Sequence, residues 1–135
     1  MILSFKKKYR ESIPARFFLF KNPSFNIQNA VWFHVCSLGE AIALKPLLDR
    51  LENQQILIST ITKTGNEQAK KYNASVRYLP YEMFLPFWIK KQKVLVVLEA
   101  EFWYLLFRVA FARGAKVILL NARISDKSVK KYLQF

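Results

Sequence analysis

The sequence predicts an α/β fold, a Rossmann-like parallel sheet with helices on both faces. Two observations predict it. From residue 30 onwards, apolar segments of strand length alternate with segments whose apolar residues recur at helical spacing. The strand-length segments are almost continuously apolar, as expected for parallel strands that are covered on both sides. We therefore expect right-handed crossovers through the intervening helices.

Five strands and four or five helices are expected. The strands are expected at residues 30–36, 55–60, 75–79, 94–98 and 116–120. The helices are expected at residues 41–51, 67–72, 84–91 and 102–113. Pro46 is expected to kink the first of these helices, and Gly114 is expected to end the fourth. Ser125 or Asp126 is placed to cap one more helix near the end of the chain.

Composition limits the class of protein. A chain of 135 residues with 53% apolar residues is long enough for one domain with a core and too apolar for wholesale disorder. A net charge of +13 favours an anionic partner, namely nucleic acid, an acidic membrane surface or a phosphorylated substrate. The single cysteine excludes an internal disulfide, and a cytoplasmic setting is expected. No apolar segment reaches the ~18 residues needed to cross a bilayer.

The domain is expected at residues 30–135, preceded by a basic and aromatic arm at residues 1–29. In this arm, cations stand beside bulky aromatic residues at 6–10 and 16–21. Such a composition suits the interface of an anionic leaflet, where each basic residue contributes about 1 kcal/mol. Two interpretations stay open, a membrane-proximal arm and an ordinary solvated basic arm.

Several motifs are missing from the sequence. It contains neither the glycine-rich fingerprint of dinucleotide sites nor a phosphate-binding P-loop motif. No spacing of His, Cys and acidic residues suggests a metal site, so we expect neither a metal nor a cofactor. His34 lies in the middle of an expected strand and is predicted to be a core residue rather than a catalyst. Cys36 is predicted to be a small buried residue.

Polar residues follow the expected strands and are the candidates for chemistry. Parallel strands point one way, so residues that follow them meet at one edge of the sheet, where α/β proteins bind ligands. After the first two strands, the candidates are Ser37, Gly39, Glu40, Thr62 and Thr64. After the fourth and fifth strands, they are Glu99, Glu101, Asn121 and Arg123. A carboxylate can act as a general base, and hydroxyl and amide groups can bind a sugar.

Each candidate also has a structural interpretation. Glu40 in the first turn of a helix would be favoured by the helix dipole by ~0.3–1 kcal/mol without any catalytic role. Glu99 and Glu101 could pair with Arg123 or cap the following helix. The turn at residues 62–65 is either an ordinary polar turn or a phosphate-contacting loop at a helix N-terminus.

Five motifs together carry a resemblance to a known family. They are Ser37-Leu38-Gly39-Glu40, Thr60-Ile61-Thr62-Lys63-Thr64-Gly65, Tyr78-Leu79-Pro80-Tyr81, Glu99-Ala100-Glu101 and Asn121-Ala122-Arg123. In this order and spacing, the chain resembles the 3-deoxy-D-manno-octulosonic acid (Kdo) transferases of lipopolysaccharide assembly. The resemblance implies the N-terminal, acceptor-binding half of a GT-B glycosyltransferase, which moves Kdo from CMP-Kdo to the lipid A precursor without a catalytic metal.

The resemblance also implies roles for single residues. The catalytic base falls on Glu40, and Glu99 and Glu101 line the same cleft, with one of the pair essential. The expected partners are the lipid A precursor and the anionic surface of the inner membrane on its cytoplasmic face, and no nucleic acid. The family's C-terminal donor domain, which binds CMP-Kdo, is absent from residues 1–135. This chain is therefore expected to be inactive unless a separate donor-domain polypeptide completes it.

Two other interpretations stay open. One is a non-catalytic, basic Rossmann-like binding module for nucleic acid or a protein partner. The other is a truncated gene product without function.

Overall fold

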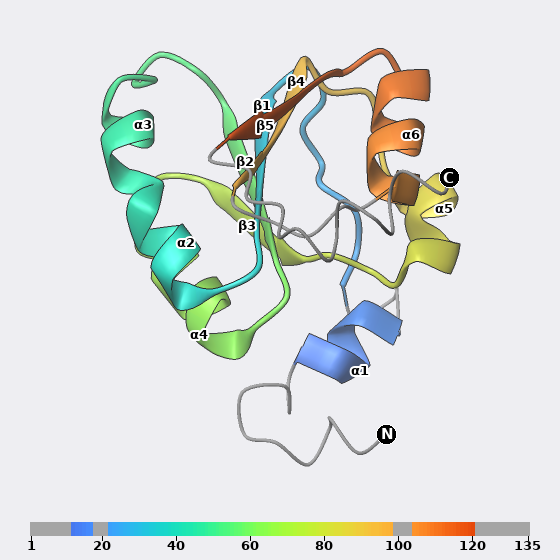
Figure 1. Cartoon of the computed structure of the whole chain (residues 1–135), viewed down its shortest axis with the longest axis horizontal. Helices are drawn as coiled ribbons and strands as arrows, with labels where there is room; N and C mark the ends of the chain where they lie inside the picture. Colours follow the sequence, from blue (N-terminus) through green and yellow to red (C-terminus); the bar gives the residue numbers. More distant parts are fainter. Residues whose placement is uncertain (1–11, 18–21, 99–103, 121–135) are drawn as a thin grey trace, which may run out of the picture.

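The computed structural model describes residues 12–17, 22–98 and 104–120. Their centre is a five-stranded, wholly parallel sheet in the order β3-β2-β1-β4-β5 (Figure 1). The strands are β1 Val31–Val35, β2 Ile56–Thr60, β3 Ser75–Tyr78, β4 Val94–Leu98 and β5 Lys116–Leu120. The predicted fold class is confirmed, and every strand end lies within one residue of its expected position.

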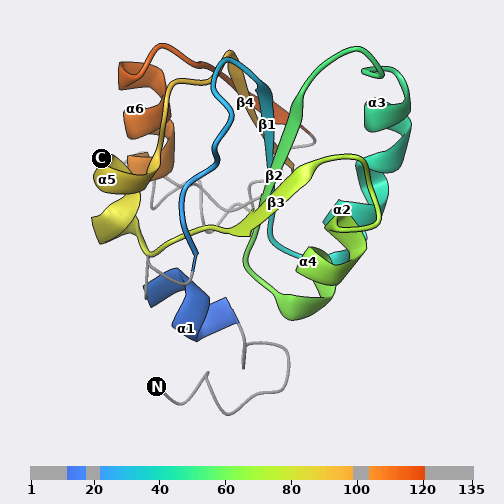
Figure 2. The ribbon, with the colours of Figure 1, turned by 180° about the vertical axis from the view of Figure 1, so that it is seen from behind.

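Helices cover both faces of this sheet. The helices are α1 Ser12–Phe17, α2 Leu38–Ala43, α3 Lys45–Asp49, α4 Lys63–Ala69, α5 Leu85–Trp88 and α6 Tyr104–Ala112, with a 3₁₀ turn, η3, at Glu82–Phe84. Both views place α2, α3 and α4 on one side of the sheet and α5 and α6 on the other (Figures 1 and 2). Among the described residues, no helix combines the length and apolar character needed to cross a membrane.

Three helices differ from the sequence prediction. The helix expected at 41–51 begins earlier, at Leu38, and is divided into α2 and α3, with Pro46 in the first turn of α3. The α4 helix begins at Lys63 rather than at residue 67, because Thr62 caps it. The helix expected at 84–91 ends at Trp88. Gly114 follows α6 with a φ of 93°, as the expected stop signal requires.

Two apolar cores lie on opposite faces of the sheet. Alternate residues of the central strands, such as Trp32, Leu57 and Leu95, pack with α5 and α6. Their neighbours, such as Phe33 and Ile58, pack with α2 and α4. Because both faces are covered, each central strand is apolar at almost every position, which is the pattern seen in the sequence.

Residues before β1 complete the edge of the sheet. The Asn22 side chain accepts a hydrogen bond from the Tyr78 backbone N–H (3.2 Å) and donates one to the Tyr78 carbonyl (2.6 Å), so it pairs with the outer edge of β3. Phe25 is buried against Trp32 and Trp88. The described parts of residues 1–29 therefore contain no strand, as expected, but they pack on the domain.

Candidate active site

The strand register brings the ends of the strands together. Val35 at the end of β1 pairs with Thr60 at the end of β2, and on the other side of β1 His34 pairs with Val97 of β4. The last residue of β4 pairs with the last residue of β5. The turns after β1 and β2 therefore leave the same edge of the sheet, beside the ends of β4 and β5. Glu99, Glu101, Asn121 and Arg123 follow β4 and β5 but lie outside the described residues.

The turn after β1 is a helix cap built from Ser37 and Glu40. Ser37 has extended backbone, and its Oγ accepts a hydrogen bond from the Glu40 N–H at 3.2 Å. In return, the Glu40 carboxylate reaches back and its Oε2 accepts a hydrogen bond from the Cys36 N–H at 2.6 Å. This arrangement is close to the reciprocal capping box, in which serine and glutamate satisfy the free N–H groups of a helix start.

The position of Glu40 bears on both interpretations of the sequence. The carboxylate is partly buried at the carboxyl edge of the sheet, where a ligand is expected. One oxygen is oriented by the Cys36 N–H, which fixes the side chain in the turn. A helix-capping role is thus present, and the catalytic role of Glu40 stays a prediction.

The turn after β2 has the same design and contacts the first turn. Thr62 caps α4, since its Oγ1 accepts a hydrogen bond from the Gly65 N–H at 3.1 Å. Gly65 is buried against the carbonyl group of Ser37: a Cβ at this position would lie 3.3 Å from the Ser37 carbon and oxygen. The starts of α2 and α4 therefore touch at a glycine, and the structure brings Ser37, Glu40 and Thr62 into one cluster.

Thr64 and Gly39 lie on the exposed side of this cluster. If Gly39 carried a Cβ, the nearest atom to it would be the Ser37 Oγ, 4.0 Å away, so packing alone does not require glycine there. Asn66 follows the turn after β2, in α4, and was not among the candidates. Its buried side-chain N–H donates to the Thr60 Oγ1 at 3.0 Å and ties α4 to the end of β2.

A buried polar chain runs from the core to the same turn. The Trp32 Nε1–H donates to the Ser59 Oγ at 2.8 Å, and this oxygen lies 2.8 Å from Nδ1 of His34. On the other side of the ring, Nε2 lies 3.7 Å from the Cys36 sulfur. Cys36 is partly exposed rather than buried as predicted, because it stands at the end of the strand.

His34 itself is a neutral core residue, as predicted. Its side chain is fully buried, and burial lowers its pKa to about 3, with the positive charge of Arg16 acting in the same direction. The hydrogen bond to the Ser59 carbonyl acts in the opposite direction. At neutral pH the imidazole therefore connects Ser59 and Cys36 without carrying a charge.

Arg16 was expected in a basic arm that is either membrane-proximal or solvated, but the structure buries it. Its guanidinium is buried, its Nε donates to the Leu79 carbonyl at 2.6 Å, and its Cζ lies 4.5 Å from the centre of the Tyr81 ring. The Tyr81 N–H in turn donates to the Arg16 carbonyl at 3.3 Å. A cation of α1 is thereby fixed beside the residues that follow β3, at the carboxyl edge. No periodic pattern in the sequence predicted α1, so nothing located this charge.

Metal ligands do not gather in the described part of the chain: no three His, Cys or acidic residues there lie close enough to hold an ion. The prediction of a metal-free site stays a prediction, because Glu99 and Glu101 lie outside that part.

Comparison with known proteins decides the family. A family model described as 3-deoxy-D-manno-octulosonic-acid transferase (Kdo transferase) matches residues 11–135. The chain belongs to the Kdo transferase family. The match extends over every described element of the domain, so the resemblance carried by the five motifs is confirmed. The parallel sheet described above is the N-terminal domain of this family's GT-B fold.

Three curated proteins are similar to this chain along most of its length. A 3-deoxy-D-manno-octulosonic acid transferase of Haemophilus influenzae is 31% identical over 97% of this chain and 34% of its own length. The enzyme of the same name from Rickettsia felis is 30% identical, over 79% of this chain and 25% of its own length. A bifunctional glycosyltransferase/methyltransferase of Fusobacterium nucleatum is 30% identical, over 76% of this chain and 18% of its own length.

The chain thus spans at most about a third of the length of these relatives. No solved structure gives a significant match.

Proposed function

We propose that residues 1–135 form the acceptor-binding half of a glycosyltransferase that moves Kdo from CMP-Kdo to the lipid A precursor. The observation that carries the proposal is the cluster of Ser37, Glu40 and Thr62, in which two helix starts meet and one carboxylate is held at the carboxyl edge. Family membership supports the transferred sugar, and the net charge of +13 supports a phosphorylated acceptor.

In this proposal Glu40 is the catalytic base. As the acceptor hydroxyl attacks the anomeric carbon of Kdo, its proton passes to the Glu40 carboxylate. A new carbon–oxygen bond forms, and CMP leaves from the opposite face of the sugar with the electron pair of the broken bond, which inverts the configuration. Such proton removal by a positioned carboxylate contributes about 10²–10⁴-fold to a rate.

The other candidates surround this base in the proposal. Glu99 and Glu101 follow β4, the strand next to β1, and one of them orients the acceptor or a cation. Binding of the acceptor's hydroxyl and phosphate groups is proposed for Ser37, Gly39, Thr62, Thr64, Asn121 and Arg123. No cofactor is required by this chemistry, since the donor is already activated by its nucleotide.

The remaining part of the family's length is proposed to supply the CMP-Kdo site, on the same polypeptide or on a separate one. The proposed place of action is the cytoplasmic face of the inner membrane, where an anionic surface and the lipid acceptor are both found. A chain limited to residues 1–135 should therefore bind the acceptor without transferring Kdo.

The test is an assay of the purified 135-residue chain with the lipid A precursor and CMP-Kdo. We expect binding of the precursor that weakens when its phosphates are removed, and no transferred Kdo. Turnover by this chain alone would refute the need for a donor half. Equal binding of the precursor with and without phosphates would refute the assignment of the acceptor site.

A further inference from the structure

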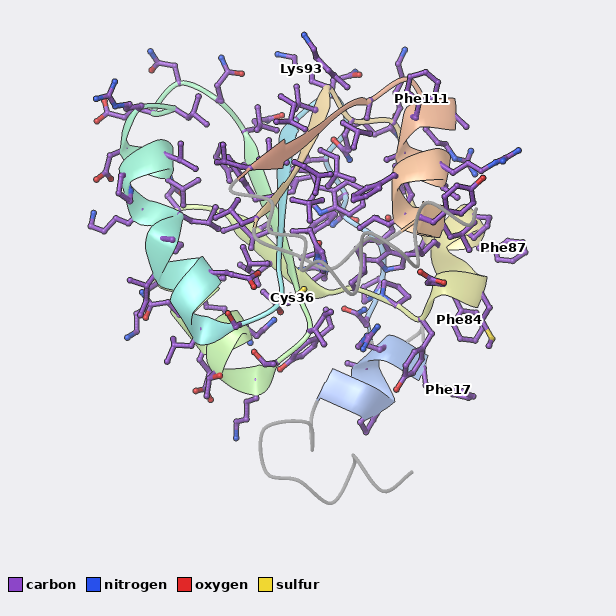
Figure 3. The ribbon with its side chains drawn as sticks, in the orientation of Figure 1. Phe17, Cys36, Phe84, Phe87, Lys93 and Phe111 are labelled. Carbon is purple, nitrogen blue, oxygen red and sulfur yellow. The ribbon has the colours of Figure 1, made fainter. Side chains whose placement is uncertain are left out.

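Large apolar side chains are exposed along one side of the molecule. Five of them, which we call the aromatic face, belong to α1, η3, α5 and α6: Phe17, Met83, Phe87, Tyr104 and Phe111. Phe87 is 83% exposed and Phe111 is 73% exposed. Figure 3 shows Phe17, Phe87 and Phe111 on the same side of the molecule, directed away from the sheet. Exposed apolar clusters of this kind mark interaction surfaces.

These side chains lie on the faces of their helices that do not pack on the core. In α5, Leu85 and Trp88 are the buried residues, so Phe87 between them faces outward. In α6, Leu106 and Ala110 pack on the sheet. Tyr104 and Phe111, two helical turns apart, share the opposite face with Arg108 between them, as the helical period requires. The exposure therefore follows from the same periodicity that builds the core.

Positive charge accompanies the aromatic face. Residues 104–113, which carry Tyr104 and Phe111, contain two arginines, Arg108 and Arg113, and no carboxylate. Both arginines are held among the exposed apolar residues. Arg108 donates to the Tyr104 hydroxyl at 2.9 Å, and Arg113 donates to the Pro86 carbonyl beside Phe87 at 2.6 Å.

A shallow hollow of about 300 Å³ opens in this side of the molecule. It is lined by Tyr104, Phe107, Arg108, Phe111 and Val117, and Arg108 is the charged residue among these five. An apolar hollow with one cation matches the chemistry of an acyl chain attached to an anionic headgroup.

We propose that the aromatic face docks on an anionic lipid bilayer, with its aromatic side chains entering the interface and its cations contacting lipid phosphates. Aromatic and basic residues together favour such interfaces. The inference deepens the proposed function and rests on it for the role of the docking, which is to bring the site to a lipid acceptor. Phe17 joins the aromatic face to the carboxyl edge, since its ring packs on Tyr81, whose ring lies against Arg16.

The test measures partitioning of the full 135-residue chain onto vesicles, with phosphatidylcholine alone or mixed with phosphatidylglycerol. The double variant Phe87→Ser/Phe111→Ser removes the two most exposed rings. We expect the partition coefficient onto the mixed vesicles to fall about tenfold, because two partly inserted phenylalanine side chains no longer contribute to binding. The control Ile42→Ser removes an exposed apolar side chain of α2, on the other side of the sheet, and should bind like the unchanged protein.

Charge is tested in the same assay. Arg108→Gln/Arg113→Gln should weaken binding to the mixed vesicles several-fold and leave the weak binding to phosphatidylcholine unchanged. Equal losses in the Phe87/Phe111 variant and in the α2 control, or no loss in either, would overturn the proposal. So would a dimer of the unchanged chain in gel filtration that the Phe87/Phe111 variant does not form while it binds vesicles normally, because the occupant would then be a second copy.

The docking and the proposed function can fail separately. Glu40→Gln alters the proposed base without touching the aromatic face and should bind vesicles normally. Normal docking together with no binding of the lipid A precursor would refute the proposed acceptor and leave the docking surface in place.

Discussion

Substitution of Gly65 by alanine tests the contact between the two turns. In a helix, alanine is normally more stable than glycine by about 1 kcal/mol, because the unfolded chain has fewer conformations to lose. At Gly65 the new Cβ would lie 2.9 Å from the Thr62 Oγ1 and 3.3 Å from two backbone atoms of Ser37. The hydroxyl can rotate, but the backbone of a capped helix start has little room to move. Overpacking of this kind costs about 1–3 kcal/mol.

Gly39 provides the matched control, since it also lies in a helix at the same edge of the sheet. Its added Cβ would have no neighbour closer than 4.0 Å, so Gly39→Ala should raise the free energy of unfolding by about 0.5–1 kcal/mol. The two substitutions are chemically identical and should have opposite signs. The difference between them should be about 1–3 kcal/mol, the cost of the overpacking.

The assay is urea unfolding at pH 7, followed by far-UV circular dichroism. We expect the midpoint of Gly65→Ala to fall and that of Gly39→Ala to rise, with unchanged slopes. If Gly65→Ala proved as stable as Gly39→Ala, then α2 and α4 would not meet at this glycine, and the cluster of Ser37, Glu40 and Thr62 would lose its basis.

Three further predictions concern stability. Burial lowers the pKa of His34 from 6.5 to about 3. At a pH between these two values the imidazole is protonated in the unfolded chain but neutral in the folded chain, so the free energy of unfolding falls as the pH is lowered. Between pH 7 and pH 5, the free energy of unfolding of the unchanged protein should fall by about 2 kcal/mol more than that of His34→Gln. An identical pH dependence of the two proteins in urea titrations would contradict the burial of His34. Ser37→Ala removes the acceptor for the Glu40 N–H and should cost about 1 kcal/mol, which Ser37→Asp should restore. Asn22→Ala removes the side chain that bonds to both the N–H and the carbonyl of Tyr78 and should cost about 1–3 kcal/mol by the same assay; a neutral result would mean that these two bonds do not hold the edge of β3.

The strands could be predicted from the sequence because their environment is uniform. A strand such as β4, covered on both faces, must be apolar throughout, and this signal is local. The helices were harder to place. Gly65 and Asn66 disfavour helix, so the first turn of α4 was not predicted. The capping residue Thr62, three residues before the glycine, was the signal that could have located it.

The N-terminal residues could not be predicted, since their structure depends on distant partners. Asn22 is fixed by the backbone of Tyr78 at the edge of β3, and Arg16 is fixed by carbonyl and ring atoms more than sixty residues away. Neither contact produces a periodic pattern in the sequence from which it could be predicted.

Part of the candidate site could be predicted, because parallel strands bring their following turns to one edge. This reasoning correctly joined Ser37 and Glu40 to Thr62. It did not reveal that Glu40 bonds to the Cys36 N–H, or that His34 links Cys36 to Ser59, because these contacts depend on side-chain positions.

The assignment of Glu40 as the base is tested most directly by Kdo transfer in a completed enzyme. Residues 1–135 would be joined to the C-terminal part of the Haemophilus influenzae relative, and transfer from CMP-Kdo to the lipid A precursor would be compared for the unchanged chimera and for Glu40→Gln. We predict that the substitution lowers kcat about 100-fold or more while binding of the precursor is retained. A Glu40→Gln chimera that transfers Kdo within a few-fold of the unchanged one would contradict this account.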